Sequence, residues 1–295
     1  MLAGPLGGEN ERSYSWEVAF RQGLGRYGAW SFSWLNEGHI PNHHRDGPLL
    51  QAWARLPVLD DRLELAAGAG PYRFFDTIAA EAGEGYANTH GWGVVVSVRA
   101  AYYFSNRWVA QLKLNRVETN GGPGTTGILF GVGYQLDAPD QPGPRESPPR
   151  RSRDVTGDEL TLMYGRSILN SEVSETSSAG ALEYRHGLAR AIDVTATYVH
   201  EAGNLHSRRD GIAAQLWLTG GYFGDRLTLS AGAGPYVAIT QNDDQTGDGR
   251  LSGLFSVSAS YRFTTRWLAR VTWNRVATRY DRDVDLILAG VGVQF

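Results

Sequence analysis

The sequence predicts an all-β fold: a transmembrane antiparallel up-and-down β-barrel built from two tandem repeats of about eight strands. Three observations predict it, namely alternation of apolar and polar residues with a period of two, an internal duplication, and tight turns that alternate with longer polar loops. The composition agrees, because 37 glycines, 11% aromatic residues and only two methionines suit strands better than helices.

The alternation is clear in both halves of the chain. In the first half, Trp30, Phe32 and Trp34 share one face of an expected strand, and Ser31 and Ser33 share the other. Strands of this kind span a membrane with roughly 9–11 residues when they are tilted. Further expected strands with the same pattern include residues 96–104, 194–198 and 287–295.

The duplication can be read directly from the letters. The segment that begins at Gly23 recurs at Gly187, and DRLELAAGAGPY from Asp61 recurs as DRLTLSAGAGPY from Asp225, both at an offset of 164. Later in the repeat, RWVAQLKLNRV recurs as RWLARVTWNRV, and GVGYQL recurs as GVGVQF at the end of the chain. We therefore expect a first repeat at 1–136, a Pro-rich charged periplasmic linker at 137–157 and a second repeat at 158–295.

The connections between strands differ on the two sides of the expected barrel. Tight turns are expected at Gly25-Arg26, Asp60-Asp61 and Ser105-Asn106, and at the matching places of the second copy. Longer polar loops are expected at 36–46, 76–90 and 119–125. Short periplasmic turns and longer extracellular loops are typical of outer-membrane barrels, so the tight turns are predicted to be periplasmic.

The two faces of the strands indicate a membrane rather than a soluble sandwich. The apolar face carries aromatic residues near the tight turns, such as Tyr102, Trp108 and Trp267, as an interfacial girdle requires. The chain also ends in an alternating strand that finishes with Phe295, which resembles the C-terminal strand of bacterial outer-membrane barrels. The predicted location is the bacterial outer membrane, crossed many times. The opposite face carries glycines and single charges: Glu64, Arg99, Lys113, Glu183, Arg185 and Arg270.

Two features of the expected architecture stay open. The first repeat offers only seven strand candidates, because residues 1–12 are short and glycine-rich, so its first strand is expected to be missing or incomplete and native N-terminal sequence to be absent. The repeats could close as two small barrels or join as one barrel of about sixteen strands. The Pro-rich linker favours two barrels, whereas an open edge in a seven-strand unit would favour one.

A cluster of polar residues is expected at the outer mouth of each copy. The motif NEGHIPNHHRDG in the first copy corresponds to HEAGNLHSRRDG in the second. The cluster could be a hydrogen-bonded plug in which Arg45 pairs with Glu37 or Asp46, a ligand or catalytic site, or a contact for lipopolysaccharide phosphates through Arg45, Arg116, Arg209 and Arg275. Its candidate residues are Asn36, Glu37, His39, His43, His44, Arg45, Asp46, Asn115, His200, Glu201, Arg209, Asp210 and Asn274.

Each repeat resembles the lipid A deacylase (PagL-type) family of outer-membrane barrels. The resemblance rests on eight strands, a glycine-rich fifth strand and a penultimate strand that ends in asparagine, here in KLNRV and TWNRV. It implies hydrolysis of an ester-linked acyl chain by a histidine and a serine two residues apart, followed by asparagine. This sequence has neither residue at those places, and only Asn115 and Asn274 correspond to the family's motif. Because a serine or threonine hydroxyl needs an adjacent base, the family's activity is not expected to carry over.

These observations lead to three functional hypotheses. The first is a non-enzymatic, lipid-embedded binding or scaffold module, and the second is an acyl-ester hydrolase acting on lipid A or phospholipid. The third is an outer-membrane channel, which depends on the repeats forming one barrel. Expected partners are outer-membrane lipid and lipopolysaccharide, with other envelope proteins as further candidates. The net charge of −3 gives no reason to expect nucleic acid, and no metal or cofactor is expected.

Overall fold

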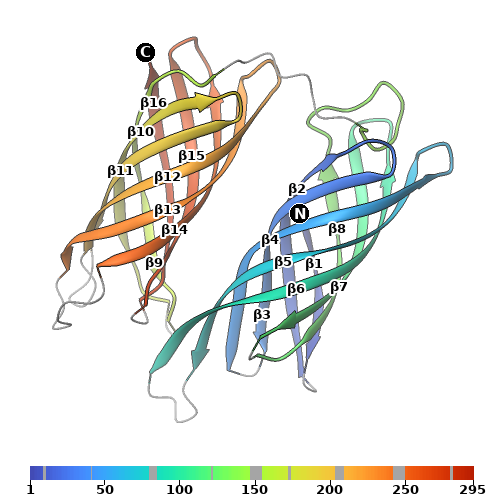
Figure 1. Cartoon of the computed structure of the whole chain (residues 1–295), viewed down its shortest axis with the longest axis horizontal. Helices are drawn as coiled ribbons and strands as arrows, with labels where there is room; N and C mark the ends of the chain where they lie inside the picture. Colours follow the sequence, from blue (N-terminus) through green and yellow to red (C-terminus); the bar gives the residue numbers. More distant parts are fainter. Residues whose placement is uncertain are drawn as a thin grey trace. The chain divides into compact units, whose positions relative to one another are not determined.

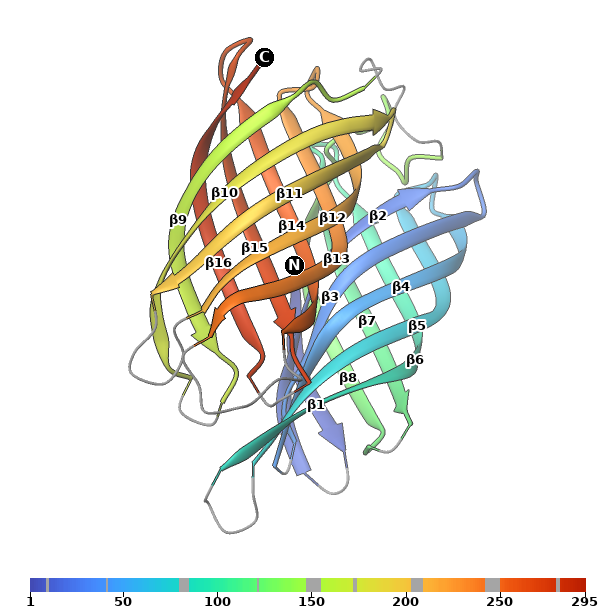
Figure 2. The same cartoon turned by 60° about the vertical axis from the view of Figure 1, so that its left-hand side comes forward.

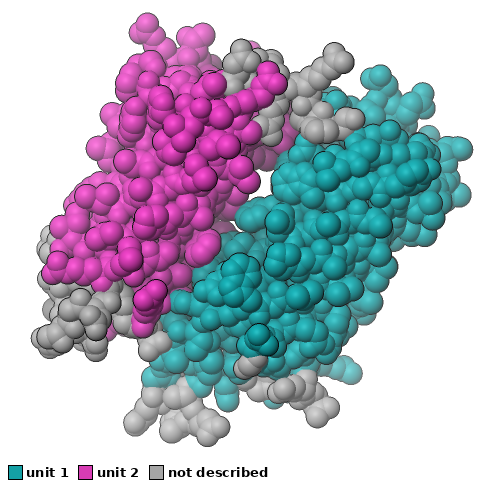
Figure 3. Space-filling model, in the orientation of Figure 1, with its two compact units in different colours: residues 1–150 teal, residues 151–295 magenta. Residues whose placement is uncertain are grey.

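The computed structural model contains sixteen β-strands in two compact units, residues 1–150 and 151–295 (Figure 3). It describes residues 1–8, 11–40, 42–79, 85–120, 122–146, 155–171, 174–202, 209–241, 250–279 and 282–295. Within these residues, no helix is long and apolar enough to cross a membrane.

Unit 1 is a closed barrel in which consecutive strands pair antiparallel and β1 pairs with β8 (Figure 1). Its strands are β1 (Leu2–Gly8), β2 (Glu11–Gly23), β3 (Gly28–Ile40), β4 (His43–Val58), β5 (Leu63–Ala79), β6 (Tyr86–Tyr103), β7 (Trp108–Thr119) and β8 (Thr125–Tyr134).

Unit 2 is a second closed barrel with the same order of strands, closed by pairing of β9 with β16 (Figure 2). Its strands are β9 (Glu159–Leu169), β10 (Thr176–Ala189), β11 (Ile192–Ala202), β12 (Arg209–Tyr222), β13 (Leu227–Gln241), β14 (Leu251–Arg262), β15 (Trp267–Ala277) and β16 (Val284–Gln294). Of the two architectures that the sequence left open, the structure has two barrels of eight strands, called barrel 1 and barrel 2 below.

The first strand of barrel 1, expected to be missing or incomplete, is present in a short form. β1 has seven residues and pairs with β2 along its whole length. Leu2 and Leu6 are each 4% exposed, so this glycine-rich segment still supplies apolar side chains to the interior. The strand therefore closes the edge that hydrocarbon would not tolerate.

The loops expected at 36–46 and 76–90 are largely strand. β3 continues to Ile40 and β4 begins at His43, while β5 and β6 have 17 and 18 residues. The apolar alternation stops where these strands leave the hydrocarbon, but their backbone hydrogen bonds continue in water. The prediction of loops at 36–46 and 76–90 was therefore wrong for most of their described residues, because these polar segments continue the hydrogen-bonded strands beyond the membrane.

Two described parts of the predicted linker pack onto the turn-side ends of the barrels. In barrel 1, Gly25 N donates to Glu146 O at 2.7 Å, and Arg55 Nη2 donates to Arg145 O at 3.0 Å. A Cβ at Gly23 would lie 2.0 Å from Arg145 O, and a Cβ at the matching Gly187 would lie 2.3 Å from Thr156 O. Both glycines therefore permit a close approach of the linker backbone. Residues 147–154 of the linker lie outside the described residues.

Candidate functional site

The expected mouth cluster of barrel 1 is centred on a buried ion pair inside the barrel. Arg45 on β4 donates from Nε and Nη2 to the two carboxylate oxygens of Glu37 on β3, both at 2.7 Å. Arg45 also donates to Thr119 Oγ1 at 3.2 Å and to Pro123 O at 3.0 Å, while the Thr125 hydroxyl donates to Glu37. Bidentate pairs of this kind are the strongest ion pairs in proteins, and this one joins four strands.

Aromatic and aliphatic side chains lie beneath this pair. The guanidinium of Arg45 lies 5.5 Å from the centre of the Phe74 ring, and Tyr72 is completely buried beside it. The buried cluster at this level contains Leu35, Leu49, Tyr72, Phe74, Val95 and Val117. The ion pair therefore packs against an apolar layer inside the barrel.

Barrel 2 repeats the pair with Glu201 on β11 and Arg209 on β12, which are joined by Arg209 Nε and Glu201 Oε1 at 2.8 Å. Ser167 donates to the other oxygen of Glu201 at 2.8 Å, and the Tyr236 ring lies 5.2 Å from the Arg209 guanidinium. The geometry in both copies matches the hydrogen-bonded plug among the three interpretations of the motif. Arg45 and Arg209 are buried and bonded to carboxylates, so neither reaches a lipid phosphate.

The histidines of the motif do not gather around Glu37. A register shift between Asn36 and His39, with Gly38 at φ 62°, is a β-bulge that reverses the direction of the following side chain. His39 therefore lies on the outer face, where its ring stacks on that of His44 with centroids 4.6 Å apart. Asn36 Nδ2 lies 3.0 Å from His44 Nε2 on the same face.

The remaining candidates lie in separate places. His43 faces the interior, where its Nδ1 is 2.7 Å from Asp76, and Asp46 is buried on β4. Asn115 and Asn274 lie deeper, accepting hydrogen bonds from Ser97 at 2.7 Å and from Ser256 at 2.6 Å, respectively. Both asparagines belong to mid-barrel networks rather than to the mouth.

The outer face of barrel 2 holds the other two candidates. His200 Nδ1 lies 2.5 Å from Asp210 Oδ1 across the β11–β12 pair. The side chain of His200 is 41% exposed, whereas the adjacent Glu201 points inward. Among the described residues of the chain, no group of three His, Cys, Asp or Glu side chains could hold a metal ion.

A second charged layer in barrel 1 lies toward the turn side. Lys113 donates to both oxygens of Glu17, at 2.8 and 2.7 Å, and to Gln51 at 3.0 Å. Glu64, which is completely buried, forms ion pairs with Arg21, Arg55 and Arg99. The alternation of the strands identified Glu64, Arg99 and Lys113 as inward charges. Their ion-pair partners lie on other strands and can be identified only once the register of the strands is known.

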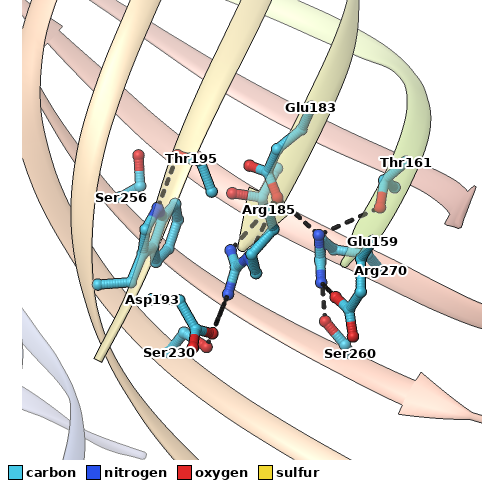
Figure 4. A network of polar contacts seen from close by, with 12 residues as sticks. Glu159, Thr161, Glu183, Arg185, Asp193, Thr195, Ser230, Ser256, Ser260 and Arg270 are labelled. Atoms are coloured by element: carbon cyan, nitrogen blue, oxygen red, sulfur yellow. Dashed lines mark hydrogen bonds and ion pairs between the residues drawn. The ribbon is translucent and has the colours of Figure 1, made fainter. Parts of the chain in front are cut away.

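Barrel 2 has a comparable layer made of different residues (Figure 4). Arg270 joins Glu159 and Glu183, each at 2.6 Å, and also donates to Ser260 and Thr161. Arg185 lies beside Glu183 and packs over Trp217 at 4.3 Å from the ring centre. These paired charges and stacked rings fill the interior, as expected of barrels with eight strands.

The outer surfaces of both barrels are apolar. Along β6 the outward residues Trp92, Val94, Val96, Val98 and Tyr102 are all at least 37% exposed. The ten residue-to-residue steps from Trp92 to Tyr102 correspond to about 25 Å of membrane thickness, at about 3.3 Å per step and a tilt of about 40°. This length matches the apolar band of transmembrane β-barrels, with an aromatic residue at each edge.

An apolar exterior around a closed ladder, with charges paired inside, defines the class of this protein. In hydrocarbon every backbone polar group needs an internal partner, and a closed barrel supplies one for each strand. The chain is an integral outer-membrane β-barrel protein with two eight-stranded barrels.

No family model matches the chain, and no curated protein matches it. Among solved structures it is similar to the KdgM porin, with a TM-score of 0.22 and 10% identity over 94% of this chain and 99% of that one. It is also similar to the CymD monoaromatic hydrocarbon channel, with a TM-score of 0.26 and 9% identity over 100% and 87%. The translocator domain of the autotransporter NalP from Neisseria meningitidis gives 0.23 and 12% over 100% and 86%. TM-scores this low say nothing about what the chain does.

Proposed function

We propose that the chain is a non-enzymatic, lipid-embedded module of the outer membrane that binds lipid on its outer surface. The observation that carries the proposal is the filling of both interiors by bonded side chains. In barrel 1, Trp53 donates to Ser31 at 2.8 Å, and in barrel 2 the matching Trp217 donates to Thr195 at 2.9 Å. The exposed apolar surface, by contrast, faces outward on every side.

The two other hypotheses receive less support. The channel depended on one barrel of about sixteen strands, whereas each repeat closes by itself. The hydrolase depended on family positions that here correspond to Asn115 and Asn274, and both lie inside the barrels. Thr272, the nearest hydroxyl on that strand, is buried and bonded to Asn274 at 3.2 Å.

The test uses the full chain in two assays. In planar bilayers we expect no stepwise conductance, with the KdgM porin as the positive control. In cells we expect the acyl pattern of lipid A and phospholipid, measured by mass spectrometry, to be the same with and without expression. Stepwise currents would replace the proposal with a channel, and loss of an acyl chain would replace it with a hydrolase.

A further inference from the structure

The outer surface of barrel 2 changes from apolar to polar at one level across four neighbouring strands. Register pairs Arg166 of β9 with Ser178 of β10, and Gly180 of β10 with both Tyr164 of β9 and His200 of β11. Closer to the tight turns, the outward positions of β9 to β12 carry exposed apolar side chains: Leu160, Leu162, Leu182, Tyr198 and Ile212. Such a change from apolar to polar side chains marks the boundary between hydrocarbon and headgroups.

A gap in the surface lies at the centre of this level. Gly180 has no side chain, and a Cβ placed there would meet only Met163 O within 4 Å, at 3.5 Å. Tyr164 and His200 stand on either side of Gly180, and Arg166 and Ser178 stand next to it on the extracellular side. We call Gly180 with these four neighbours the Gly180 notch.

Some polar side chains of the notch are held in place by hydrogen bonds, and the side chain of Arg166 is available to bind a ligand. Tyr164 Oη donates to Ser178 Oγ at 3.1 Å, and the carboxylate of Asp210 is bonded to His200. Arg166 is exposed and has no carboxylate partner among the described residues. Ser178 is hydrogen-bonded to Tyr164 and not to His200. The serine therefore has no histidine base beside it to activate it as a nucleophile, and the notch is suited to binding rather than to catalysis.

Barrel 1 provides an internal comparison. The strand pairings place different residues at every position of the notch, and bulky rings occupy the gap. The mouth ion pair of Glu37 and Arg45 recurs in barrel 2, whereas the residues of the notch do not recur in barrel 1. The residues of barrel 1 that correspond to Tyr164, Arg166, Ser178, Gly180 and His200 are Ala3, Pro5, Tyr14, Trp16 and Asn36.

We propose that the Gly180 notch binds the phosphate of an outer-leaflet lipid headgroup, an inference that rests on the lipid-binding function proposed above. Guanidinium groups recognise phosphate through paired hydrogen bonds, and Arg166, which has no carboxylate partner among the described residues, can supply them. The Ser178 hydroxyl, whose oxygen accepts from Tyr164, adds a second donor. The acyl chains of the same lipid lie along Leu162 and Leu182, which are 69% and 44% exposed directly below.

The test measures lipid retention by the full chain in detergent micelles with native mass spectrometry. The probe is phosphatidic acid, and diacylglycerol with the same chains lacks only the phosphate. We expect selective retention of phosphatidic acid and a loss of about tenfold in R166Q, the scale of hydrogen bonds to a charged group. G180W and H200N, which install the residues of barrel 1, should also weaken retention while leaving the fold intact.

The control is R116Q. Arg116 is exposed on the outer face of barrel 1, but its guanidinium is bonded to Glu118, so its removal should leave retention unchanged. Equal retention of diacylglycerol, equal losses in R116Q and R166Q, or full retention in G180W would overturn the notch. Inorganic phosphate should compete weakly, because it lacks acyl chains, and complete displacement by it would replace the lipid with a free anion. None of these outcomes alters the conductance and acyl-pattern results that decide the proposed function.

Discussion

Replacement of Arg45 by methionine tests whether the mouth pair holds barrel 1 together. Arg45 and Glu37 have side chains 3% and 1% exposed, so removing the cation leaves a carboxylate that water cannot reach. The hydroxyls of Thr125 and Tyr72 still lie against that carboxylate, but no cation does among the described residues. Breaking a buried pair on one side costs about 3–5 kcal/mol, and methionine keeps most of the side-chain volume, so a cavity adds little.

The measurement is the urea midpoint of unfolding of the full chain in lipid vesicles. Unfolding of barrel 1 is detected as its loss of resistance to protease. The matched control is R116M, because Arg116 and Glu118 form a pair whose side chains are 51% and 62% exposed. An exposed pair contributes about 0–1 kcal/mol, so R116M should barely move the midpoint. The double variant E37Q/R45M should recover part of the loss, because no isolated charge remains. Equal effects of R45M and R116M would refute the buried-pair argument.

Three further predictions concern the linker, the core and acid stability. In G23A a Cβ would lie 2.0 Å from Arg145 O, so the linker should undock and trypsin should cleave after Arg145 faster than in wild type; unchanged cleavage would contradict docking. In G68A a Cβ would lie 2.5 Å from the Trp53 ring, and overpacking should destabilise barrel 1 by about 1–3 kcal/mol in the urea assay; an unchanged urea midpoint would contradict tight packing of this ring. Hydrogen bonds from Tyr184 and His186 lower the pKa of Asp158. The stability that Asp158 supplies is therefore present above its unfolded pKa and is lost as pH falls through the folded value, and D158N should flatten the acid limb of the barrel 2 stability profile.

The period-two pattern predicts the spanning strands because one face of each meets hydrocarbon and the other meets packed side chains. It places Trp53 and Gly68 inside, where the ring and the glycine are in contact. It also places Glu37 inside, opposite Arg45. These positions follow from local alternation alone, and the barrel preserves that alternation wherever the ladder is regular.

Irregular positions could not be predicted in this way. Alternation places His39 on the same face as Glu37, but the bulge at Gly38 moves it to the outer face. A bulge adds one residue to one strand and leaves no sign in hydropathy. The Gly180 notch was missed for a related reason, because Gly180, Tyr164 and His200 lie on three strands and only the register brings them together.

The two interiors differ most where they carry charge, and the differences come in pairs. Glu17 and Lys113 of barrel 1 correspond to Ala181 and Thr272 of barrel 2, where the threonine hydroxyl donates to Val257 O at 3.2 Å. Either charge kept alone would be buried without a partner, at a cost of several kcal/mol. A joint exchange keeps the interior neutral, since the ion pair satisfies its own charges and an alanine with a bonded threonine leaves no charge unpaired. The repeats therefore share a requirement for internally paired polar groups rather than a particular set of residues, which is why the outer surface is where barrel 2 can carry a function that barrel 1 lacks.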